Sequence, residues 1–392
     1  MRFGRLGFST VLVGAMAAST MQLFAMGVLA AEIIDELAIS RSQIGILGAS
    51  NTLAGALLAP ALGRLTDRVG ARNSVLAVFL ASSVGLFLTS VAPVYWMMVV
   101  SSLISGFPQG FSNSATNKLI AVHLEPGERG VVTGIKQSGV QLAIFVGGIT
   151  LPALATVANW RIGVAGYGVV SLALAGFAWI VIPPDPQGDD VATDEAAPIL
   201  PGQRLDPFVY RVALYAFAFG VVAGGVTRFL PLFANEELGW SLQLAGLVAA
   251  LTGLLGIVAR ILWGRLAETR VAARPALLVM ALGSVLVTAL LWLSGVAGGW
   301  LLWPTAVVLS FSLAAWNVVA MLAVIRSVPA ALAGRGTGAV MFGFLGGLAV
   351  SAPIVGWSVD VTGGYDTAWV VLGVVAMIGS TTMLPERFNP WP

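Results

Sequence analysis

Cysteine is absent from the 392 residues, and histidine occurs once, at His123. Without cysteine the chain has no disulfide, no thiolate metal ligand and no cysteine nucleophile, and a single histidine makes a histidine metal centre implausible. Charged residues make up only 10% of the chain, against roughly 25% in an average soluble domain, whereas 58% of the residues are hydrophobic. The composition predicts an integral membrane protein without a metal site or a cofactor.

The hydrophobic residues gather into twelve runs, each long enough to cross a membrane. A bilayer core about 30 Å thick needs roughly 20 apolar residues at 1.5 Å per helical residue. We therefore expect an all-α membrane protein, and we expect the first run to act as an uncleaved insertion signal. The twelve predicted helices are 7–30, 44–62, 74–92, 94–117, 130–157, 162–182, 208–233, 243–263, 276–296, 300–325, 336–358 and 367–384.

One long polar stretch interrupts this pattern, at residues 183–207. It is rich in proline and aspartate and shows no apolar periodicity, which is typical of a linker. We predict an N-terminal six-helix half over 1–182, a cytoplasmic linker over 183–207 and a C-terminal six-helix half over 208–392.

The distribution of lysine and arginine predicts the orientation. With the N-terminus inside, most basic residues fall at cytoplasmic helix ends or loops, Arg260 lies about one turn inside, and only Arg41 and Arg161 fall outside. This bias satisfies the positive-inside rule. We expect a multi-pass protein of the inner or plasma membrane with both termini in the cytoplasm.

Two stretches of similar sequence lie about 201 residues apart: GRLTDRVGARN at 63–73 and GRLAETRVAARP at 264–275. Aligning Gly63 with Gly264 places Asp67 on Glu268, and one inserted residue then places Arg72 on Arg274. The offset is about half the chain. Two parallel halves with the same loop at the same place are expected of a secondary transporter built from repeats.

The first stretch resembles the loop between helices 2 and 3 that is the signature of the major facilitator superfamily. That pattern is glycine, three residues, aspartate, a basic residue, any residue, glycine, any residue and two basic residues. The chain supplies Gly63, Asp67, Arg68, Gly70 and Arg72, and Asn73 replaces the last basic residue. Together with the twelve runs, the central linker and the second copy, the resemblance covers the whole chain and implies a transporter, not an enzyme.

The resemblance also implies a role for the loop. In that family it acts as a cytoplasmic latch, in which the acidic residue pairs with a basic residue and faces a helix N-terminus of the opposite half. Asp67 beside Arg64 and Arg68 is suited to charge-assisted hydrogen bonds. In the alternative reading, the arginines are only topological anchors. The candidate latch residues are Gly63, Asp67, Arg68, Gly70 and Arg72 in the first copy, and Gly264, Arg265 and Glu268 in the second.

The resemblance further implies that helices 1, 4, 7 and 10 line a substrate cavity. In the fourth run, polar residues including Gln109 and Asn113 share an arc of roughly 140° at 100° per residue. Small residues such as Ser102 and Ser105 are better explained by close helix packing. Gln109 and Asn113 are larger and need partners, so we predict that they contact substrate.

Two cations are predicted to lie within hydrophobic spans, away from the helix ends. Lys136 shares a polar arc of the fifth run with Gln137 and Gln141. Arg228 precedes Pro231 in the seventh run, and we expect this proline to break or bend the helix. No aspartate or glutamate is placed comparably deep, so the pair would attract an anion. Two alternatives stand beside this reading: Lys136 snorkels to the cytoplasm, or Arg228 pairs with Glu236 or Glu237.

Further candidates on the predicted cavity helices are aromatic or amide residues, each of which also suits packing. They are Gln22 in the first run, Tyr210 and Phe217 in the seventh, and Trp316 and Asn317 in the tenth.

The leading hypothesis is a secondary transporter that moves a small organic anion, a carboxylate, by alternating access. The stretches AISRSQIGIL and GIKQSG are similar to bacterial facilitators of the cyanate and monocarboxylate-related groups. Proton symport, anion exchange and facilitated uniport all remain open. A drug or metabolite efflux proton antiporter is the alternative, and a receptor or membrane enzyme is a third class. The expected partners are the anion, a co-transported proton and lipid but no nucleic acid, and the chain is expected to be a monomer.

Overall fold

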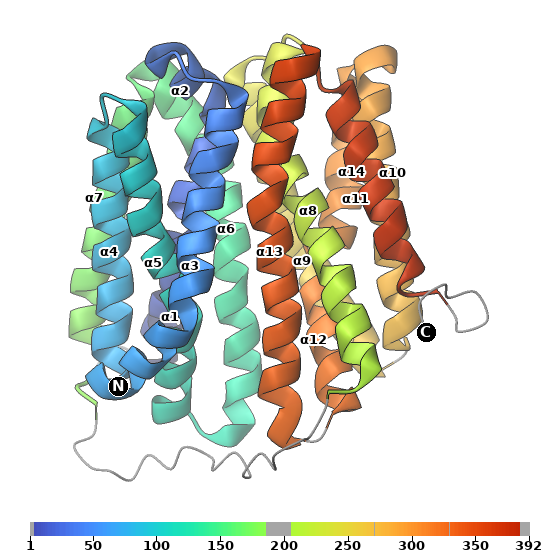
Figure 1. The fold of residues 1–392 in the computed structure, drawn as a ribbon. Helices are drawn as coiled ribbons and strands as arrows, with labels where there is room; N and C mark the ends of the chain where they lie inside the picture. The colour runs from blue at the N-terminus through green and yellow to red at the C-terminus, as the bar shows by residue number, and fades with distance from the viewer. Residues whose placement is uncertain (1–3, 186–204, 270, 329, 385–392) are drawn as a thin grey trace. The chain divides into compact units, whose positions relative to one another are not determined.

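The computed structural model describes residues 4–185, 205–269, 271–328 and 330–384, and within them the chain is helical, without a strand. It divides into two compact units: unit 1 is Met1–Val191 with Ser241–Gly253, and unit 2 is Ala192–Trp240 with Leu254–Pro392. The all-α prediction is confirmed (Figure 1). Most of the predicted linker, residues 186–204, lies outside the described residues.

Unit 1 contains the helices of the first half of the chain. Their bounds are α1 Gly4–Val28, α2 Ala30–Leu37, α3 Arg41–Val69, α4 Ala71–Val91, α5 Tyr95–His123, α6 Pro126–Val157 and α7 Trp160–Val181. The start of α3 follows from the sequence SRSQ: the Ser40 hydroxyl accepts from the backbone N–H of Gln43, and the Gln43 side chain accepts from the backbone N–H of Ser40. This capping box satisfies backbone donors that would otherwise lack partners.

The helices of the second half follow. Their bounds are α8 Pro207–Glu236, α9 Leu242–Thr269, α10 Ala273–Ala297, the short 3-10 helix η1 Gly299–Leu301, α11 Leu302–Ser312, α12 Trp316–Ser327, α13 Ala330–Thr362 and α14 Asp366–Thr381. The first part of α9, up to Gly253, groups with unit 1, and the remainder groups with unit 2.

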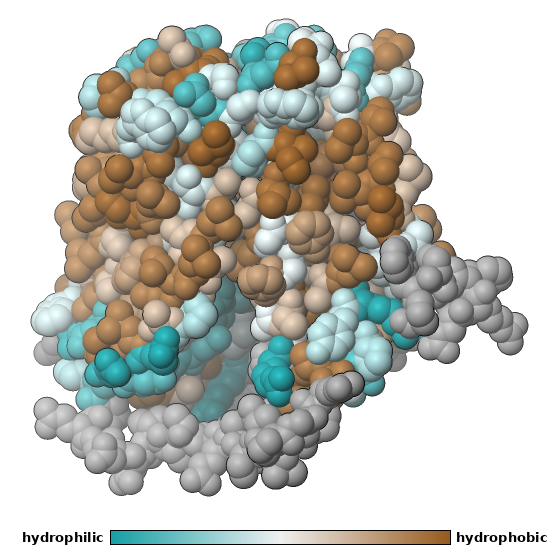
Figure 2. All heavy atoms as spheres, viewed as in Figure 1, coloured by the Kyte–Doolittle hydropathy of each residue, from teal (hydrophilic) through white to brown (hydrophobic). Residues whose placement is uncertain are grey.

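Ten helical segments of the described chain are long and apolar enough to cross a membrane. The two remaining predicted spans correspond to α5, which carries the polar row that ends in Asn113 and Asn117, and to the 16-residue α14. In Figure 2 hydrophobic residues cover the middle of the visible surface of each unit, and hydrophilic residues lie nearer the helix ends. This distribution matches a protein that crosses a bilayer.

Glycine pairs set the closest helix contacts inside each unit. Gly106 and Gly110 of α5 lie against Gly55 of α3, where a Cβ on Gly106 would be 2.5 Å from the carbonyl oxygen of Asn51. In unit 2, a Cβ on Gly224 of α8 would lie 3.1 Å from the carbonyl oxygen of Leu348 of α13. Because lipid offers no hydrophobic drive for helix association, such close van der Waals packing is what holds membrane helices together.

Two local features differ from the sequence prediction. The tenth predicted helix is broken between Ser312 and Trp316, although no glycine or proline lies there. Conversely, Pro231 does not break the seventh, since α8 runs on to Glu236 with the proline inside it. The break after Ser312 therefore arises without a helix-breaking residue in the segment itself.

Both units carry a carboxylate that accepts a hydrogen bond from an aromatic side chain at the start of a later helix. In unit 1, Glu36 at the end of α2 accepts from the Trp160 indole and forms an ion pair with Arg161, whose Nε lies 2.8 Å from Oε1. In unit 2, the Tyr365 hydroxyl donates to Glu236 at 2.6 Å. These bonds join α2 to α7 and α8 to the segment before α14.

The Glu36 contact makes unit 1 sensitive to acid. Partial burial raises the pKa of this carboxyl, but the hydrogen bonds from Arg161 and Trp160 and the Arg161 charge outweigh it, so the pKa is lowered from its ordinary value of 4.5. A carboxylate with a lowered pKa adds stability above its unfolded-state pKa and loses it as the pH falls through the folded-state value.

We therefore predict that Glu36→Gln weakens the acid sensitivity of the protein. The difference in Tm between neutral pH and about pH 4 should be smaller than in the wild type, whereas Glu32→Gln, on the exposed face of the same helix, should leave that difference unchanged. Thermal unfolding in detergent measures it. An equal pH dependence in all three proteins would contradict the role of Glu36.

Candidate functional site

A buried polar network joins four helices of unit 1 around Gln22. The Gln22 amide donates toward Ser102 at 3.3 Å and Thr89 at 3.4 Å, and its oxygen accepts from Asn51 Nδ2 at 3.0 Å. Thr89 in turn donates to Ser101 at 3.0 Å. These side chains belong to α1, α3, α4 and α5 and are almost fully buried. Gln22 thus connects helices within unit 1, and a substrate contact for it stays a prediction.

Lys136 of α6 is fully buried, and both of its hydrogen-bond partners are neutral. Its Nζ lies 2.9 Å from the Thr116 hydroxyl and 2.5 Å from the amide oxygen of Asn117, both on α5. No carboxylate forms an ion pair with Lys136 in the described part of the chain. The side chain of Lys136 is therefore directed at Thr116 and Asn117, which lie about two turns before the end of α5 at His123.

The other predicted amides of α5 and α6 differ in burial, and two of them form a hydrogen bond with each other. Gln137 Nε2 donates to Asn113 Oδ1 at 3.1 Å. Asn113 is exposed, Gln109 is half-buried with a buried, unpartnered Oε1, and Gln141 is buried. Gln109, Asn113 and Asn117 are spaced four residues apart, so they form one stripe along α5. Lipid cannot solvate an exposed amide stripe inside a span, so this face requires water or a polar ligand.

Arg228 of α8 is buried, with 8% of its surface exposed, and it has no ion-pair partner in the described residues. Its Nη1 is buried without a hydrogen-bond acceptor. The pairing of Arg228 with Glu236 or Glu237 that the sequence left open is not observed, and Glu236 instead accepts the Tyr365 hydroxyl. A buried guanidinium without a partner is energetically costly and needs an acceptor when the site is used.

The aromatic candidates of unit 2 have different environments. Trp316 is buried, and its ring centroid lies 4.9 Å from that of Phe344 and 6.0 Å from that of Phe219. Asn317 is half-buried, with a buried Oδ1 that lacks a partner. Tyr210 and Phe217 are exposed at 58% and 39%. The structure thus places Trp316 in an aromatic cluster, and Tyr210 outside the core.

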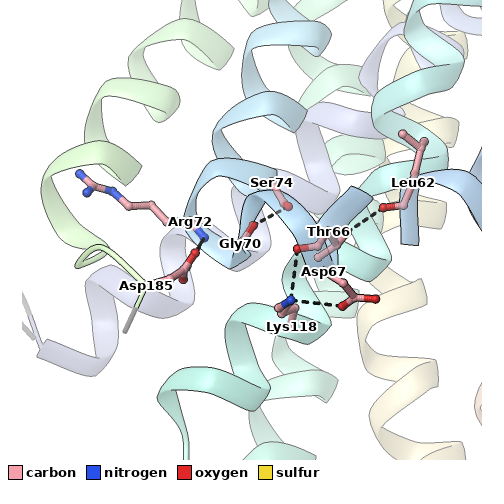
Figure 3. Close-up of polar contacts among 8 residues, drawn as sticks. All are labelled: Leu62, Thr66, Asp67, Gly70, Arg72, Ser74, Lys118 and Asp185. Carbon is pink, nitrogen blue, oxygen red and sulfur yellow. Dashed lines mark hydrogen bonds and ion pairs between the residues drawn. The ribbon is translucent and has the colours of Figure 1, made fainter. Parts of the chain in front are cut away.

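The signature loop lies at the end of α3, and Asp67 pairs with a residue that the sequence did not suggest. Lys118 of α5 lies 3.2 Å from the Asp67 carboxylate and also donates to the Thr66 carbonyl at 3.2 Å (Figure 3). The expected partners Arg64 and Arg68 do not form this pair. Since Lys118 and Asp67 are 51 residues apart, only the parallel packing of α3 and α5 brings them together.

The second half of the loop contacts the end of α7. The Asp185 carboxylate accepts from the backbone N–H of Arg72 at 3.3 Å, in the first turn of α4 (Figure 3). The Arg72 guanidinium lies 4.1 Å from the Trp179 ring centroid and donates to the Trp179 carbonyl. Gly70 has a φ of +86°, and a Cβ there would overlap the Asp185 carboxylate. Glycine is therefore required at this position.

The second copy of the loop is less fully described. Gly264 of α9 lies next to Val318, where a Cβ would be 3.5 Å from Cγ1, and Arg265 has polar contacts of its own. The side chain of Glu268 lies outside the described residues. For Gly63 of the first copy, a Cβ would meet open space.

The fold and these residues define a class of protein: a multi-pass helical membrane transporter built from two related halves. The chain matches the Major Facilitator Superfamily model over residues 11–352 and belongs to that family.

Similarity to individual proteins agrees with this family. The chain is 25% identical over 390 residues to a probable sulfoacetate transporter of Cupriavidus necator, covering 89% of this chain and 86% of the relative. It is 22% identical over 246 residues to a hexuronate transporter of Bacillus subtilis, covering 60% of this chain and 57% of the relative. A bacterial homologue of the human lysosomal transporter Spinster has the same fold, with a TM-score of 0.77, 14% identity and 98% of both chains covered.

We predict that Gln22→Ala lowers the stability of the protein. The substitution leaves buried groups of Asn51, Thr89 and Ser102 with fewer partners, which should cost about 1 to 3 kcal/mol. Thermal unfolding in detergent measures the loss, and Thr10→Ala, at an exposed residue of the same helix that bonds only its own helix backbone, is the control. Equal Tm values for the two variants would show that the network does not stabilise unit 1.

Proposed function

We propose that the protein transports a small organic anion, with Lys136 and Arg228 as the residues that attract it. The observation that carries the proposal is that both cations are buried and neither is paired with a carboxylate in the described chain. A cation in the middle of a membrane helix costs about 2.5 to 3.5 kcal/mol on insertion scales. Such a cost is retained in a protein when the charge has a function.

The hydrogen-bond partners of Lys136 leave its charge uncompensated, and this supports an anion as the ligand. Thr116 and Asn117 supply oxygen atoms that orient the ammonium but do not neutralise it. A carboxylate or sulfonate would supply the opposite charge, and charge-assisted hydrogen bonds are roughly twice as strong as neutral ones. The neighbouring amides Gln109, Asn113, Gln137 and Gln141 would then bind the uncharged polar groups of the substrate. In unit 2, Trp316 and Asn317 are the residues that we propose to contact it.

The relatives point to the same chemical class. Sulfoacetate and hexuronates, which the names of two relatives give as their substrates, are both organic anions. We propose a carboxylate-bearing anion for this chain, carried by alternating access of the two halves as proton symport or anion exchange. The protein would act in the inner or plasma membrane as a monomer, with both termini in the cytoplasm.

Substrate binding provides a direct test of the two cations. Lys136→Gln and Arg228→Gln should each raise the half-saturating concentration for uptake of an anion such as sulfoacetate or glucuronate at least about tenfold, because each removes a charge-assisted hydrogen bond. Uptake into proteoliposomes measures this. Arg5→Gln, at an exposed residue near the start of α1, serves as the control. Wild-type affinity in both variants would refute the proposed site.

We also propose that Asp67 and its loop act as a conformational latch, for which Lys118 is one of the partners. Asp67→Asn removes the ion pair at the end of α3 and α5 but keeps a side chain of the same size. Because the side chain of Asp67 is 67% exposed, the pair contributes little to stability. The variant should therefore retain its Tm but transport more slowly, and Asp35→Asn on the exposed face of α2 is the control. Unchanged transport rates in a well-folded Asp67→Asn protein would mean that the loop is not a latch.

A further inference from the structure

The break between α11 and α12 is the main irregularity of unit 2. The Ala314 N–H bonds the Leu309 carbonyl at 3.2 Å, five residues back, and the Val318 N–H bonds the Ala315 carbonyl at 3.2 Å, three residues back. The Leu313 N–H still bonds the Leu309 carbonyl four residues back, at 2.8 Å, so the regular pattern is lost after Leu313. Figure 1 shows α11 and α12 as neighbouring segments of unit 2. Inside a membrane every carbonyl freed in this way must find another donor.

Two side chains of α9 supply those donors. Arg260 Nε donates to the Ala314 carbonyl at 2.9 Å, and Trp263 Nε1 donates to the Phe311 carbonyl at 2.8 Å. In a regular helix the Ala314 carbonyl would accept from the backbone N–H of Val318, which here bonds the Ala315 carbonyl instead. The segment around the break has no glycine or proline. The structure therefore supports the insertion of these two donors as the physical cause of the break.

The corresponding part of unit 1 lacks both the donors and the break. With Gly63 aligned on Gly264, the positions of Arg260 and Trp263 are occupied by Ala59 and Leu62 of α3. Neither of these side chains is a hydrogen-bond donor. The helix α5, which corresponds to α11 and α12, is continuous over Tyr95–His123 even though it contains Pro108. The donors and the break therefore occur together in one half and are absent together from the other.

The break comes directly before two residues of the proposed site. Trp316, the first residue of α12, packs against Phe344, and the buried Oδ1 of the next residue, Asn317, has no partner in the described structure. The direction in which α12 leaves the break decides where these two side chains lie. A shift of about 1 Å in such groups is enough to weaken function strongly.

We propose that Arg260 and Trp263 are positioning residues, which hold the helix open at Leu313–Ala315 so that Trp316 and Asn317 meet the substrate. This inference rests on the proposed function, because it takes Trp316 and Asn317 as substrate contacts. Arg260 and Trp263 act through the backbone of α11 and α12 and do not themselves touch the anion.

The test uses the natural lack of cysteine in the chain. Val307→Cys on α11 and Ile325→Cys on α12, which are 43% and 51% exposed, provide one spin-label site on each side of the break. Electron-spin distance measurements on the purified full-length protein then report the bend directly, without any ligand. Trp263→Phe removes only the indole N–H and keeps an aromatic ring, and Arg260→Lys keeps the charge but loses the planar guanidinium.

We expect Trp263→Phe and Arg260→Lys to shift and broaden the distance distribution. Each should also raise the half-saturating concentration for uptake of sulfoacetate or glucuronate by about tenfold, with the maximal rate less affected. Trp292→Phe, at a 43% exposed tryptophan of α10, is the matched control and should change neither quantity.

An unchanged distance distribution in both variants would overturn the proposal, because the donors would not hold the break. A changed distribution with unchanged half-saturation would also overturn it, since the bend would not position the site. If the wild-type protein transports neither anion, the proposed function fails and the positioning role fails with it, while the distance measurement still reports whether the α9 donors hold the break.

Discussion

The burial of two cations without a compensating carboxylate is the constraint on which the account of this protein depends. Burying Arg228 and Lys136 inside membrane spans costs free energy. In the described chain the only hydrogen bonds that offset part of this cost come from the neutral partners of Lys136. A ligand of opposite charge is the simplest component that offsets both costs. The anionic substrate is therefore inferred from what the helices leave uncompensated, and the names of the relatives point in the same direction.

The rest of each unit provides a rigid frame for these side chains. Glycine contacts between α3 and α5 and between α8 and α13 bring backbones close, so small changes in side-chain volume would displace whole helices. The Gln22 network ties four helices of unit 1 through buried amide and hydroxyl groups. Such a frame fits a transporter whose halves move while their interiors stay intact.

The two units differ in where they depart from regular helices. In unit 1, α5 is continuous, and Lys136 of α6 donates to it. In unit 2, the corresponding helix is broken between α11 and α12, and two of its carbonyls accept hydrogen bonds from side chains of α9.

Apolar run length was enough to predict an all-α chain, and the loop motif with its second copy pointed to the family, because both are local properties of the sequence. The placement of Lys136 and Arg228 within hydrophobic runs followed from the same pattern. The partner of Asp67 did not, since Lys118 is brought to it only by the packing of α3 on α5. Nor did the break before Trp316, because its cause lies on another helix, at Arg260 and Trp263.

The contacts between the second half of the loop and α7 could not be predicted either, because they also depend on the packing of helices that are distant in the sequence. Asp185 follows α7 and lies at the start of α4 only in the folded unit, and Arg72 stacks on Trp179 for the same reason.

The most direct measurement of anion recognition by the buried cations is a thermal-shift comparison of the purified protein with glucuronate and with its neutral amide. If the buried cations recognise an anion, the carboxylate raises the Tm and the amide does not, whereas equal stabilisation by both would show that the cations do not recognise an anion.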